Sequence, residues 1–376
     1  MSDRLTTAYI DLAKYTQNLS KIKSQIGRDV SIMAVVKANA YGHGIIEIAQ
    51  AAAAQKVRYL GVACLYEARQ LREAGITYPI MVIDYIDPDS CDEALDLSLT
   101  LTVMDPQVIA CLAKLSKKRG QITKVHLKVD TGMHRAGCDP DECDDLVDLI
   151  RSSPFLELEG VFTHFANGED PDQTHMHSQL KLFNSIVSKL HKRNIFPPLI
   201  HAANSAAMLT DRSTHFTMVR PGIITYGINP LPKGHPLYKK VSDDFLPILQ
   251  LTSQIIHIRT LGSGEHIGYG STYTTTRKSR IALVPIGYGD GLMRQCQSTR
   301  QMIVLGKKVP FVGRISMDQC SIDVTDIKAK VGDRVIIIGT ERSSHISVSD
   351  LANESSTIDY EVLTNIMPRI TRCYTW

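Results

Sequence analysis

The chain has 376 residues, of which 43% are hydrophobic and 22% charged, and its formal net charge is +3. This length exceeds what one ordinary hydrophobic core fills, so two domains are expected in a globular protein. The charge is too small to predict a nucleic-acid partner or a membrane surface. The start, MSDRLTTAYIDLAKY, has no apolar signal core, and no run reaches membrane-spanning length. Eight cysteines without a C-x-x-C pair indicate reduced thiols in a cytoplasmic protein.

Short apolar runs alternate with helical patterns over the first part of the chain. The helical patterns include residues 65–74, 106–119 and 173–193. This alternation predicts an α/β fold, a (β/α)8 TIM-like barrel over residues 9–230. Its eight candidate strands are 32–36, 60–64, 80–83, 99–103, 125–129, 160–163, 199–201 and 223–226.

The pattern changes after a segment with three prolines and no apolar period, NPLPKGHPLYKKVSDDF, within which residues 231–244 form a predicted junction. From residue 245 to 376 the strand-like runs include LQLTSQIIHIRTL, RIALVPIGY, QMIVLGKKVPFVG and GDRVIIIGT. We therefore expect a mostly β C-terminal domain, with a hairpin turn at Gly306.

The segment SIMAVVKANAYGHG, residues 31–44, begins a strand–loop–helix unit with Lys37 at the carboxyl end of its strand. Ligands bind at that edge in parallel α/β folds. A lysine there often marks only the return of the chain to water. However, Val36 and Ala38 would desolvate the amine and make it more nucleophilic, and Tyr41 adds a hydroxyl. The combination suits a Schiff-base site for a phosphorylated aldehyde cofactor.

AVVKANAYGHG closely resembles the pyridoxal-phosphate lysine motif of alanine racemases. Further motifs recur in the family's order, so the resemblance extends from about Tyr9 to Arg372. It implies that pyridoxal 5'-phosphate is bound to Lys37 and that the chain interconverts L-alanine and D-alanine. It also implies a homodimer with active sites shared between subunits, which nothing in the composition requires.

Two further strand ends supply candidate ligands. DTGMHRAG carries Arg135, whose guanidinium suits a carboxylate or a phenolic oxygen. In the family, the matching arginine binds the cofactor's phenolic oxygen and helps to seat the substrate carboxylate. The resemblance makes Lys128 a candidate for the lysine that is carbamylated in some members, although alternation along the strand leaves its direction open. GVFTHFA carries His164, which is matched to a residue beside the cofactor ring, and Glu169 stands where the family commonly has aspartate.

HAANSAAM and MVRPGIITYG supply the candidate phosphate site. Ser205 fits a helix N-cap, and it fits equally an anion site at a helix N-terminus. Gly222 permits the backbone to approach a ligand closely. In the family, this serine and the amides matching Gly222 and Ile223 bind the phosphate. The other cofactor-binding candidates are Tyr41, Asn204 and, in IDYEV, Tyr360.

Arg220 is matched in the family to the arginine at the cofactor's pyridine nitrogen. An arginine keeps its proton at ordinary pH and can only donate a hydrogen bond. The ring nitrogen then stays unprotonated, so the cofactor withdraws electrons weakly. A carbanion formed beside it would be reprotonated quickly, which favours racemisation over side reactions.

Racemisation needs a proton acceptor on each face of the α-carbon. The resemblance assigns one face to Lys37 and the other to Tyr269, in HIGYGSTY, from the partner subunit. Without the resemblance, Tyr269 reads as a strand aromatic. The substrate-binding candidates are Tyr288, in VPIGYGDG, and Met317 and Asp318, in GRISMDQC. Two tyrosines at the entrance favour a small substrate side chain.

Three other functions stay open. The first is a racemase of this architecture that acts on serine or a broader range of amino acids. The second is a non-catalytic cofactor-binding barrel, which would have no use for Tyr269 or a β domain. The third is a decarboxylase with a related fold. No metal site is expected, because His175 and His177 lie two residues apart and do not share a helix face.

Overall fold

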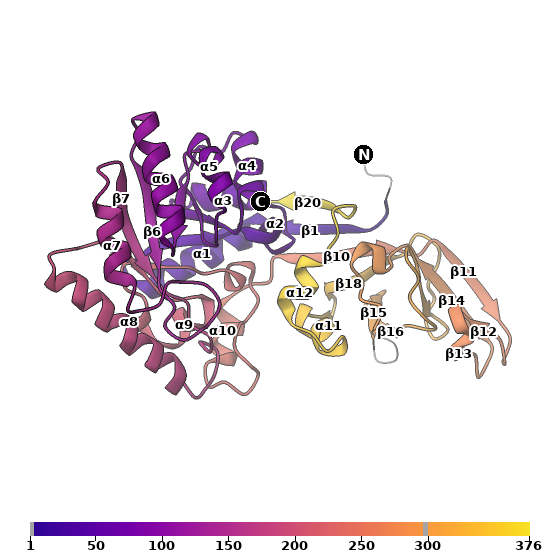
Figure 1. Cartoon of the computed structure of the whole chain (residues 1–376). Helices are drawn as coiled ribbons and strands as arrows, with labels where there is room; N and C mark the ends of the chain where they lie inside the picture. Colours follow the sequence, from indigo (N-terminus) through magenta and orange to yellow (C-terminus); the bar gives the residue numbers. More distant parts are fainter. Residues whose placement is uncertain (1–3, 296–299) are drawn as a thin grey trace. The chain divides into compact units, whose positions relative to one another are not determined.

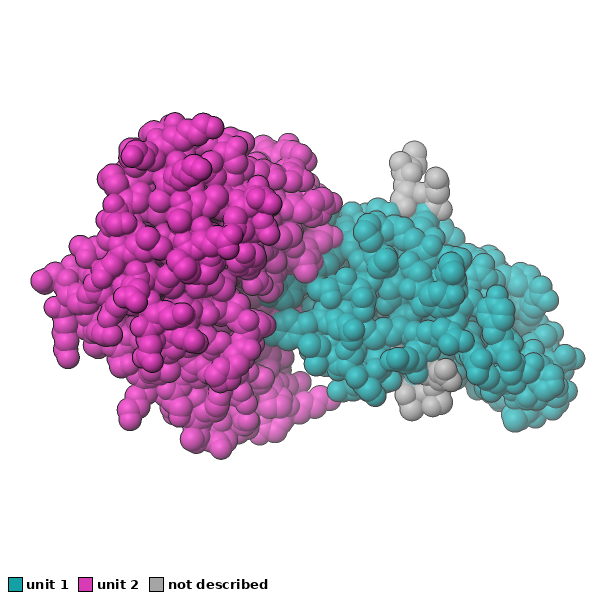
Figure 2. All heavy atoms as spheres, in the orientation of Figure 1, with its two compact units in different colours: residues 1–13, 41–44, 247–376 teal, residues 14–40, 45–246 magenta. Residues whose placement is uncertain are grey.

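The computed structural model describes residues 4–295 and 300–376. Contacts between residues divide the chain into two compact units, which Figure 2 colours separately. We call them the barrel unit, residues Lys14–Ala40 and Ile45–Leu246, and the β unit, residues Met1–Ala13, Tyr41–Gly44 and Pro247–Trp376. These units differ from the predicted bounds, because the predicted junction, residues 231–244, lies in the barrel unit, whereas residues 9–13 and 41–44 lie in the β unit.

Eight parallel strands close the predicted barrel, which confirms the fold class. Figure 1 labels β6 and β7 among them. Short runs rich in branched apolar residues form them, as expected for strands that are buried on both faces. In order around the barrel they are β2 Ser31–Val35, β3 Tyr59–Val62, β4 Ile80–Val82, β5 Thr100–Val103, β6 Thr123–Lys128, β7 Leu156–Phe162, β8 Leu199–His201 and β9 Met218–Val219.

The predicted strand over residues 223–226 is wrong. Ile223–Tyr226 forms a buried 3-10 turn, η3, and the eighth barrel strand is β9, which pairs with β2 and β8. A strand of two residues leaves almost no periodic signal, whereas the turn after it makes a conspicuous apolar run. The hydroxyl of Tyr226 donates to the carbonyl of Val35 at 2.9 Å, which ties the turn to β2.

Helices follow most of the barrel strands, and their ends are set by local chemistry. Asp105 begins α6, Pro106–Arg119, by accepting a hydrogen bond from the Val108 N–H at 2.9 Å, and Gly120 ends it with a left-handed φ of 64°. The other helices include α3 Ile45–Ala54, α4 Leu65–Glu73, α5 Cys91–Asp96, α7 Cys143–Arg151, α8 Thr174–Lys192, α9 Ser205–Thr210, α10 Tyr238–Asp244 and α1 Leu12–Ile26, of which the first two residues belong to the β unit.

The inside of the barrel is a packed core. Side chains from six strands meet there in one apolar cluster, formed by Met33, Tyr59, Met81, Phe162, Leu199 and Met218. Such a core fills the barrel and leaves the carboxyl ends of the strands as the place where polar side chains can gather.

The β unit is built on a mixed sheet with the strand order β16-β15-β18-β10-β1-β20, in which β19 also pairs with β18. Strand β1 pairs with β10 and with β20, so the first and last strands of the chain share this sheet. The predicted hairpin is confirmed, since β15 and β16 pair antiparallel on either side of Gly306. A three-stranded sheet has the order β11-β14-β17, and β12 pairs with β13.

The bounds in the β unit are β1 Thr7–Asp11, β10 Leu249–Gln254, β11 His257–Leu261, β12 His266–Ile267, β13 Tyr273–Thr274, β14 Ser279–Val284, β15 Gln301–Val304, β16 Lys307–Pro310, β17 Cys320–Asp323, β18 Arg334–Glu341, β19 Ser344–Ile346, β20 Thr371–Thr375, α11 Val348–Glu354 and α12 Asp359–Thr364. No helix within the described ranges is long and apolar enough to cross a membrane. The cysteines described are free thiols, and Cys296 lies outside the described residues.

Candidate functional site

Lys37 directly follows the end of β2, at the carboxyl end of the barrel. The N–H of Val36 donates to the carbonyl of Gly61 at 2.8 Å, and the N–H of Val35 donates to that of Pro221 at 3.2 Å. The end of β2 is thereby held between β3 and the segment that follows β9. The side chain of Lys37 is half-buried. The position predicted from the sequence for this lysine is therefore the one that the fold gives it.

The residues after Lys37 form a left-handed turn, where the sequence predicts a loop. Within α2, Lys37–Tyr41, the φ angles of Ala38, Asn39 and Ala40 are 52°, 53° and 52°. Left-handed helical geometry costs roughly 1–2 kcal/mol per residue for L-amino acids. Strain of this kind persists only where surrounding contacts fix the backbone, and it is concentrated at functional sites.

Two side chains hold the left-handed turn. The buried carboxylate of Glu67 accepts hydrogen bonds from the N–H of Ala38 at 2.6 Å and of Ala63 at 2.7 Å. The side-chain oxygen of Asn39 accepts from the N–H of Ile45 at 2.9 Å. Sequence reasoning missed Glu67, because its role depends on a residue 29 positions away and no local pattern marks it.

Cationic side chains gather around His164 at the carboxyl end of the barrel. Burial lowers the pKa of His164 well below its usual value, and the charges of Arg220, Arg135, Lys128 and Lys37 lower that pKa further. His164 is therefore a neutral imidazole. The four cations form what we call the cation cluster, and all four were predicted as site residues.

Lys128 ends β6 with its side chain turned inward, which the sequence left open. The residue is 5% exposed, and its Nζ lies 5.6 Å from the centroid of the Phe162 ring. Burial lowers the pKa of Lys128 to about 8, and the charges of the other members of the cation cluster act in the same direction. The charge of Asp84 acts in the opposite direction and raises the pKa of Lys128.

Arg220 follows β9 and is almost entirely buried. Its NH1 donates to Nδ1 of His201 at 2.8 Å. Its NH2 donates to the carbonyls of Thr163 and Ala202 at 2.8 and 2.9 Å and lies 3.1 Å from Nδ1 of His164. Burial lowers the pKa of Arg220 to about 9, so the guanidinium stays charged at neutral pH. Among the described residues no hydrogen-bond acceptor contacts its Nε, which leaves that donor for a ligand.

Ser205 lies beside Gly222, as expected of a phosphate site, but it is not the helix N-cap. Asn204 caps α9 by accepting from the N–H of Ala207 at 3.0 Å. The hydroxyl of Ser205 instead accepts from the N–H of Gly222 at 2.9 Å. Ile223 begins the 3-10 turn η3, whose first N–H groups have no acceptor within the turn. The fold thus brings these four predicted residues together.

Arg135 lies on an exposed loop that is shaped by one carboxylate. Asp130 accepts from the N–H groups of Gly132, Met133 and His134 through Oδ1 and from that of Arg135 through Oδ2, at 2.8–3.1 Å. Burial opposes the shift, yet these four amides hold the pKa of Asp130 below its usual value. A cavity of about 10 Å³ is lined by residues that include Lys128, Arg135 and His164. These three predicted residues are therefore neighbours.

Within the β unit, Tyr41 and Tyr360 lie side by side. Their ring centroids are 6.0 Å apart, and the rings are tilted by 47°. The guanidinium of Arg372 donates to the carbonyl of Gly42 at 3.0 and 3.1 Å, which fixes the segment that carries Tyr41. A side chain at Gly42 would meet the carbonyl of Leu363 at 2.0 Å, so only glycine permits this approach.

The β unit also brings Tyr288 next to Met317. The N–H of Tyr288 donates to the carbonyl of Ser316 at 3.1 Å, and that of Gly289 donates to the carbonyl of Met317 at 2.8 Å. Asp318 forms an ion pair with Arg369 at 2.8 Å. Arg369 is not among the residues predicted from the sequence. Tyr269 begins the 3-10 turn η4, Tyr269–Ser271, and is 70% exposed. Most of the surface of Tyr269 is thus exposed in one chain.

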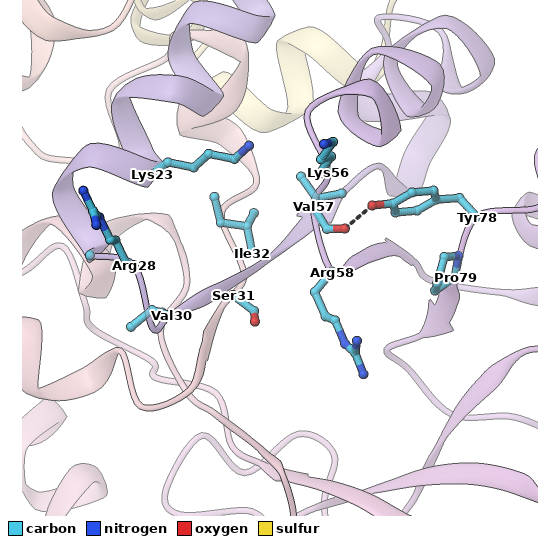
Figure 3. A pocket seen from close by; sticks show the side chains of 11 residues that line it. Lys23, Arg28, Val30, Ser31, Ile32, Lys56, Val57, Arg58, Tyr78 and Pro79 are labelled. Carbon is cyan, nitrogen blue, oxygen red and sulfur yellow. Dashed lines mark hydrogen bonds between the residues drawn. The ribbon is translucent and has the colours of Figure 1, made fainter.

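A separate cavity of about 670 Å³ lies at the amino-terminal ends of β2, β3 and β4. Figure 3 shows its wall, where the hydroxyl of Tyr78 donates to the carbonyl of Val57. Lys23, Arg28, Lys56 and Arg58 contribute positive charge, and none of the site residues predicted from the sequence lines it. This cavity and the cation cluster lie at opposite ends of the barrel strands.

Two family models match the chain. The alanine racemase N-terminal domain matches residues 10–230, and the alanine racemase C-terminal domain matches residues 248–374. Among curated relatives, alanine racemase 1 of Caldanaerobacter subterraneus subsp. tengcongensis is 39% identical over 99% of this chain and 95% of its own length. Alanine racemase of Methanococcus maripaludis is 37% identical over 98% of each chain.

Solved structures agree with these relatives. Alanine racemase from Bacillus anthracis with bound L-Ala-P is 36% identical, with a TM-score of 0.93 over 99% of this chain and 95% of that one. Alanine racemase of Clostridium difficile 630 in complex with cycloserine is 33% identical, with a TM-score of 0.90 over 98% of this chain and 95% of that one. The chain belongs to the alanine racemase family.

Proposed function

We propose that this chain interconverts L-alanine and D-alanine with pyridoxal 5'-phosphate as its cofactor. Family membership supports the reaction, and a solved relative with bound L-Ala-P supports the substrate. The observation in this chain that carries the proposal is the cation cluster around neutral His164. Like charges that are partly removed from water favour an anionic ligand, and phosphate and carboxylate groups meet that need.

The described residues fit this cofactor at three points. Lys37 offers an amine, the region of Ser205 and Gly222 offers polar groups beside the first turn of η3, and Arg220 offers its Nε–H. When bound, the cofactor condenses with amines and makes the α-hydrogen of an attached amino acid acidic. Arg220 would donate to the ring nitrogen without protonating it, because its guanidinium stays charged.

The other predicted residues take roles by family resemblance. Lys37 and Tyr269 act as the two bases, and Arg135 seats the substrate carboxylate. Asn204 and Ile223 join Ser205 and Gly222 around the phosphate, while His164 lies beside the ring. The hydroxyls of Tyr41 and Tyr360 complete the phosphate contacts, and the substrate contacts are Tyr288, Met317 and Asp318.

We further propose that Lys128 carries a carbamate. Because the pKa of Lys128 is lowered to about 8, about half of its amines are neutral at pH 8. An ordinary lysine has under about 1% neutral amine at that pH. The neutral Nζ forms a bond to the carbon of carbon dioxide and releases one proton to solvent. The resulting negative charge would attract the guanidinium of Arg135.

The active form that we propose is a cytoplasmic homodimer. Family resemblance supports an arrangement in which Lys37 of one subunit and Tyr269 of the other serve the same substrate. The exposure of Tyr269 in one chain is compatible with this role. A two-fold axis would create two equivalent active sites in each dimer.

The purified protein supplied with the cofactor should racemise L-alanine, and faster than it racemises L-serine or larger L-amino acids. Lys37→Ala should lose more than about a hundredfold in kcat, because one proton acceptor and the cofactor's anchor disappear together. Chiral chromatography of the reaction mixture measures both effects. The matched control is Lys181→Ala at an exposed lysine, which should keep wild-type activity. Faster racemisation of serine would favour the broader racemase, and carbon dioxide release would favour a decarboxylase.

Carbon-13 NMR in labelled bicarbonate at pH 8 should show a carbamate resonance. The signal should vanish in Lys128→Arg and persist in Lys192→Arg, which changes an exposed lysine. It should also weaken as the pH falls below about 8, because the protonated amine no longer reacts. A signal that survives in Lys128→Arg would contradict the assignment to Lys128.

Mixed dimers should regain activity that either parent variant lacks. When Lys37→Ala and Tyr269→Phe are dissociated together and reassociated, random pairing makes about half of the dimers mixed. One site in each mixed dimer combines intact Lys37 with intact Tyr269, so activity should return to about a quarter of wild type. Each variant reassociated alone should stay inactive. A mixture that stays inactive after demonstrated subunit exchange would refute the shared site.

A further inference from the structure

A buried carboxylate lies inside the barrel unit, on the side away from the cation cluster. Glu159 belongs to β7, and its side chain is 1% exposed. Its Oε1 accepts from Nζ of Lys124 at 2.7 Å and from NH2 of Arg58 at 3.3 Å. Its Oε2 accepts from the hydroxyl of Tyr59 and lies 3.0 Å from Nε2 of His126. Burial would raise the pKa of Glu159, yet the hydrogen bonds from His126, Lys124 and Tyr59 lower that pKa to about 2.

An irregular backbone sets this side chain in place. Between β6 and β7, Val125 pairs with Leu158, and the next residue, His126, pairs with Gly160. Glu159 is therefore an extra residue of β7 without a partner on β6. A β-bulge of this kind turns a side chain from its regular direction. Gly160 then leaves room for the imidazole, since a Cβ there would lie 2.5 Å from Nδ1 of His126. The backbone is therefore shaped around the contact between Glu159 and His126.

Hydrogen bonds continue from His126 to Arg220 through a second buried imidazole. Nδ1 of His126 lies 2.8 Å from Nε2 of His201, and Nδ1 of His201 lies 2.8 Å from NH1 of Arg220. Both histidines are fully buried, and the ring of Phe162 stacks on His201 at 4.6 Å. Glu159, His126, His201 and Arg220 thus form a continuous chain, which we call the relay.

Both ends of the relay require the same arrangement of protons. Arg220 can only donate, so Nδ1 of His201 must present a lone pair. The carboxylate of Glu159 can only accept, so Nε2 of His126 must carry a proton. Burial lowers the pKa of both imidazoles, so each is neutral and holds one proton. The remaining bond therefore runs from the Nε2–H of His201 to Nδ1 of His126.

The relay has no place for another proton. A proton added to Nδ1 of His201 would face the N–H of Arg220, and one added to Nδ1 of His126 would face the N–H of His201. Reversing both tautomers would also break the bond to Arg220. We propose that Glu159 is a positioning residue for Arg220, because it fixes the tautomers that keep a lone pair directed at the guanidinium. This inference deepens the proposed function, in which Arg220 faces the ring nitrogen of the cofactor.

Nitrogen-15 NMR of the full-length protein with labelled histidines tests the relay directly. In the wild type, Nδ1 of both His126 and His201 should resonate as an unprotonated nitrogen and Nε2 as a protonated one. Comparison with His126→Gln and His201→Asn spectra assigns the signals. A proton on Nδ1 of either residue in the wild type would overturn the inference, whether or not the protein racemises alanine. The expected nitrogen pattern in a protein without racemase activity would support the relay and refute the proposed function.

Glu159→Gln supplies the second measurement. Its amide can donate to Nε2 of His126, so the reversed tautomers should become populated at both imidazoles. The kcat for alanine should fall at least about tenfold, by analogy with the loss of outer-shell partners that orient metal-binding side chains. Glu157→Gln, at an exposed position of the same strand, should keep the wild-type spectrum and kcat. A Glu159→Gln protein with the wild-type nitrogen pattern and wild-type kcat would overturn the proposal.

Discussion

Positive charge that is held away from water at the carboxyl end of the barrel is the constraint on which the candidate site depends. Burial lowers the pKa of Lys128 to about 8 and that of Arg220 to about 9. Concentrating like charges in a place of low polarity is costly unless anions or hydrogen-bond acceptors compensate. Arg220 is compensated by carbonyls and neutral imidazoles, which stabilise its charge without cancelling it. The cluster therefore keeps its attraction for a phosphate or a carboxylate.

Backbone irregularities in the barrel unit set the directions of two groups of side chains. At the carboxyl end, the left-handed turn after Lys37 is held by Glu67 and by the side chain of Asn39. Deeper in the barrel, the bulge at Glu159 directs a carboxylate toward His126. Each irregularity replaces regular backbone geometry with contacts that only the folded chain provides. The residues that fix these two irregularities, Glu67, Asn39 and Glu159, are outside the set of site residues predicted from the sequence.

The features that the sequence predicts well are those with a local cause. Seven of the barrel strands overlap the apolar runs predicted for them, and α6 has a capping aspartate before it and a glycine after it. The eighth strand, β9, is too short for a periodic signal, so the sequence indicates the apolar turn η3 in its place. The candidate residues around Lys37, Ser205 and Arg220 follow from motifs. The relay does not follow from a motif, because its tautomers and the bulge at Glu159 depend on contacts between residues up to 75 positions apart.

Exchange of the α-proton with deuterium oxide tests most directly whether the two proposed bases, Lys37 and Tyr269, act on different enantiomers. Each enantiomer of alanine presents its α-hydrogen to one face, so removing one base should affect one enantiomer more. In Tyr269→Phe, exchange should be lost much more for L-alanine than for D-alanine, since Lys37 remains to serve the latter. Proton NMR of the two enantiomers, each incubated separately with the variant, measures the two rates. Equal loss of exchange for L-alanine and D-alanine would contradict the account.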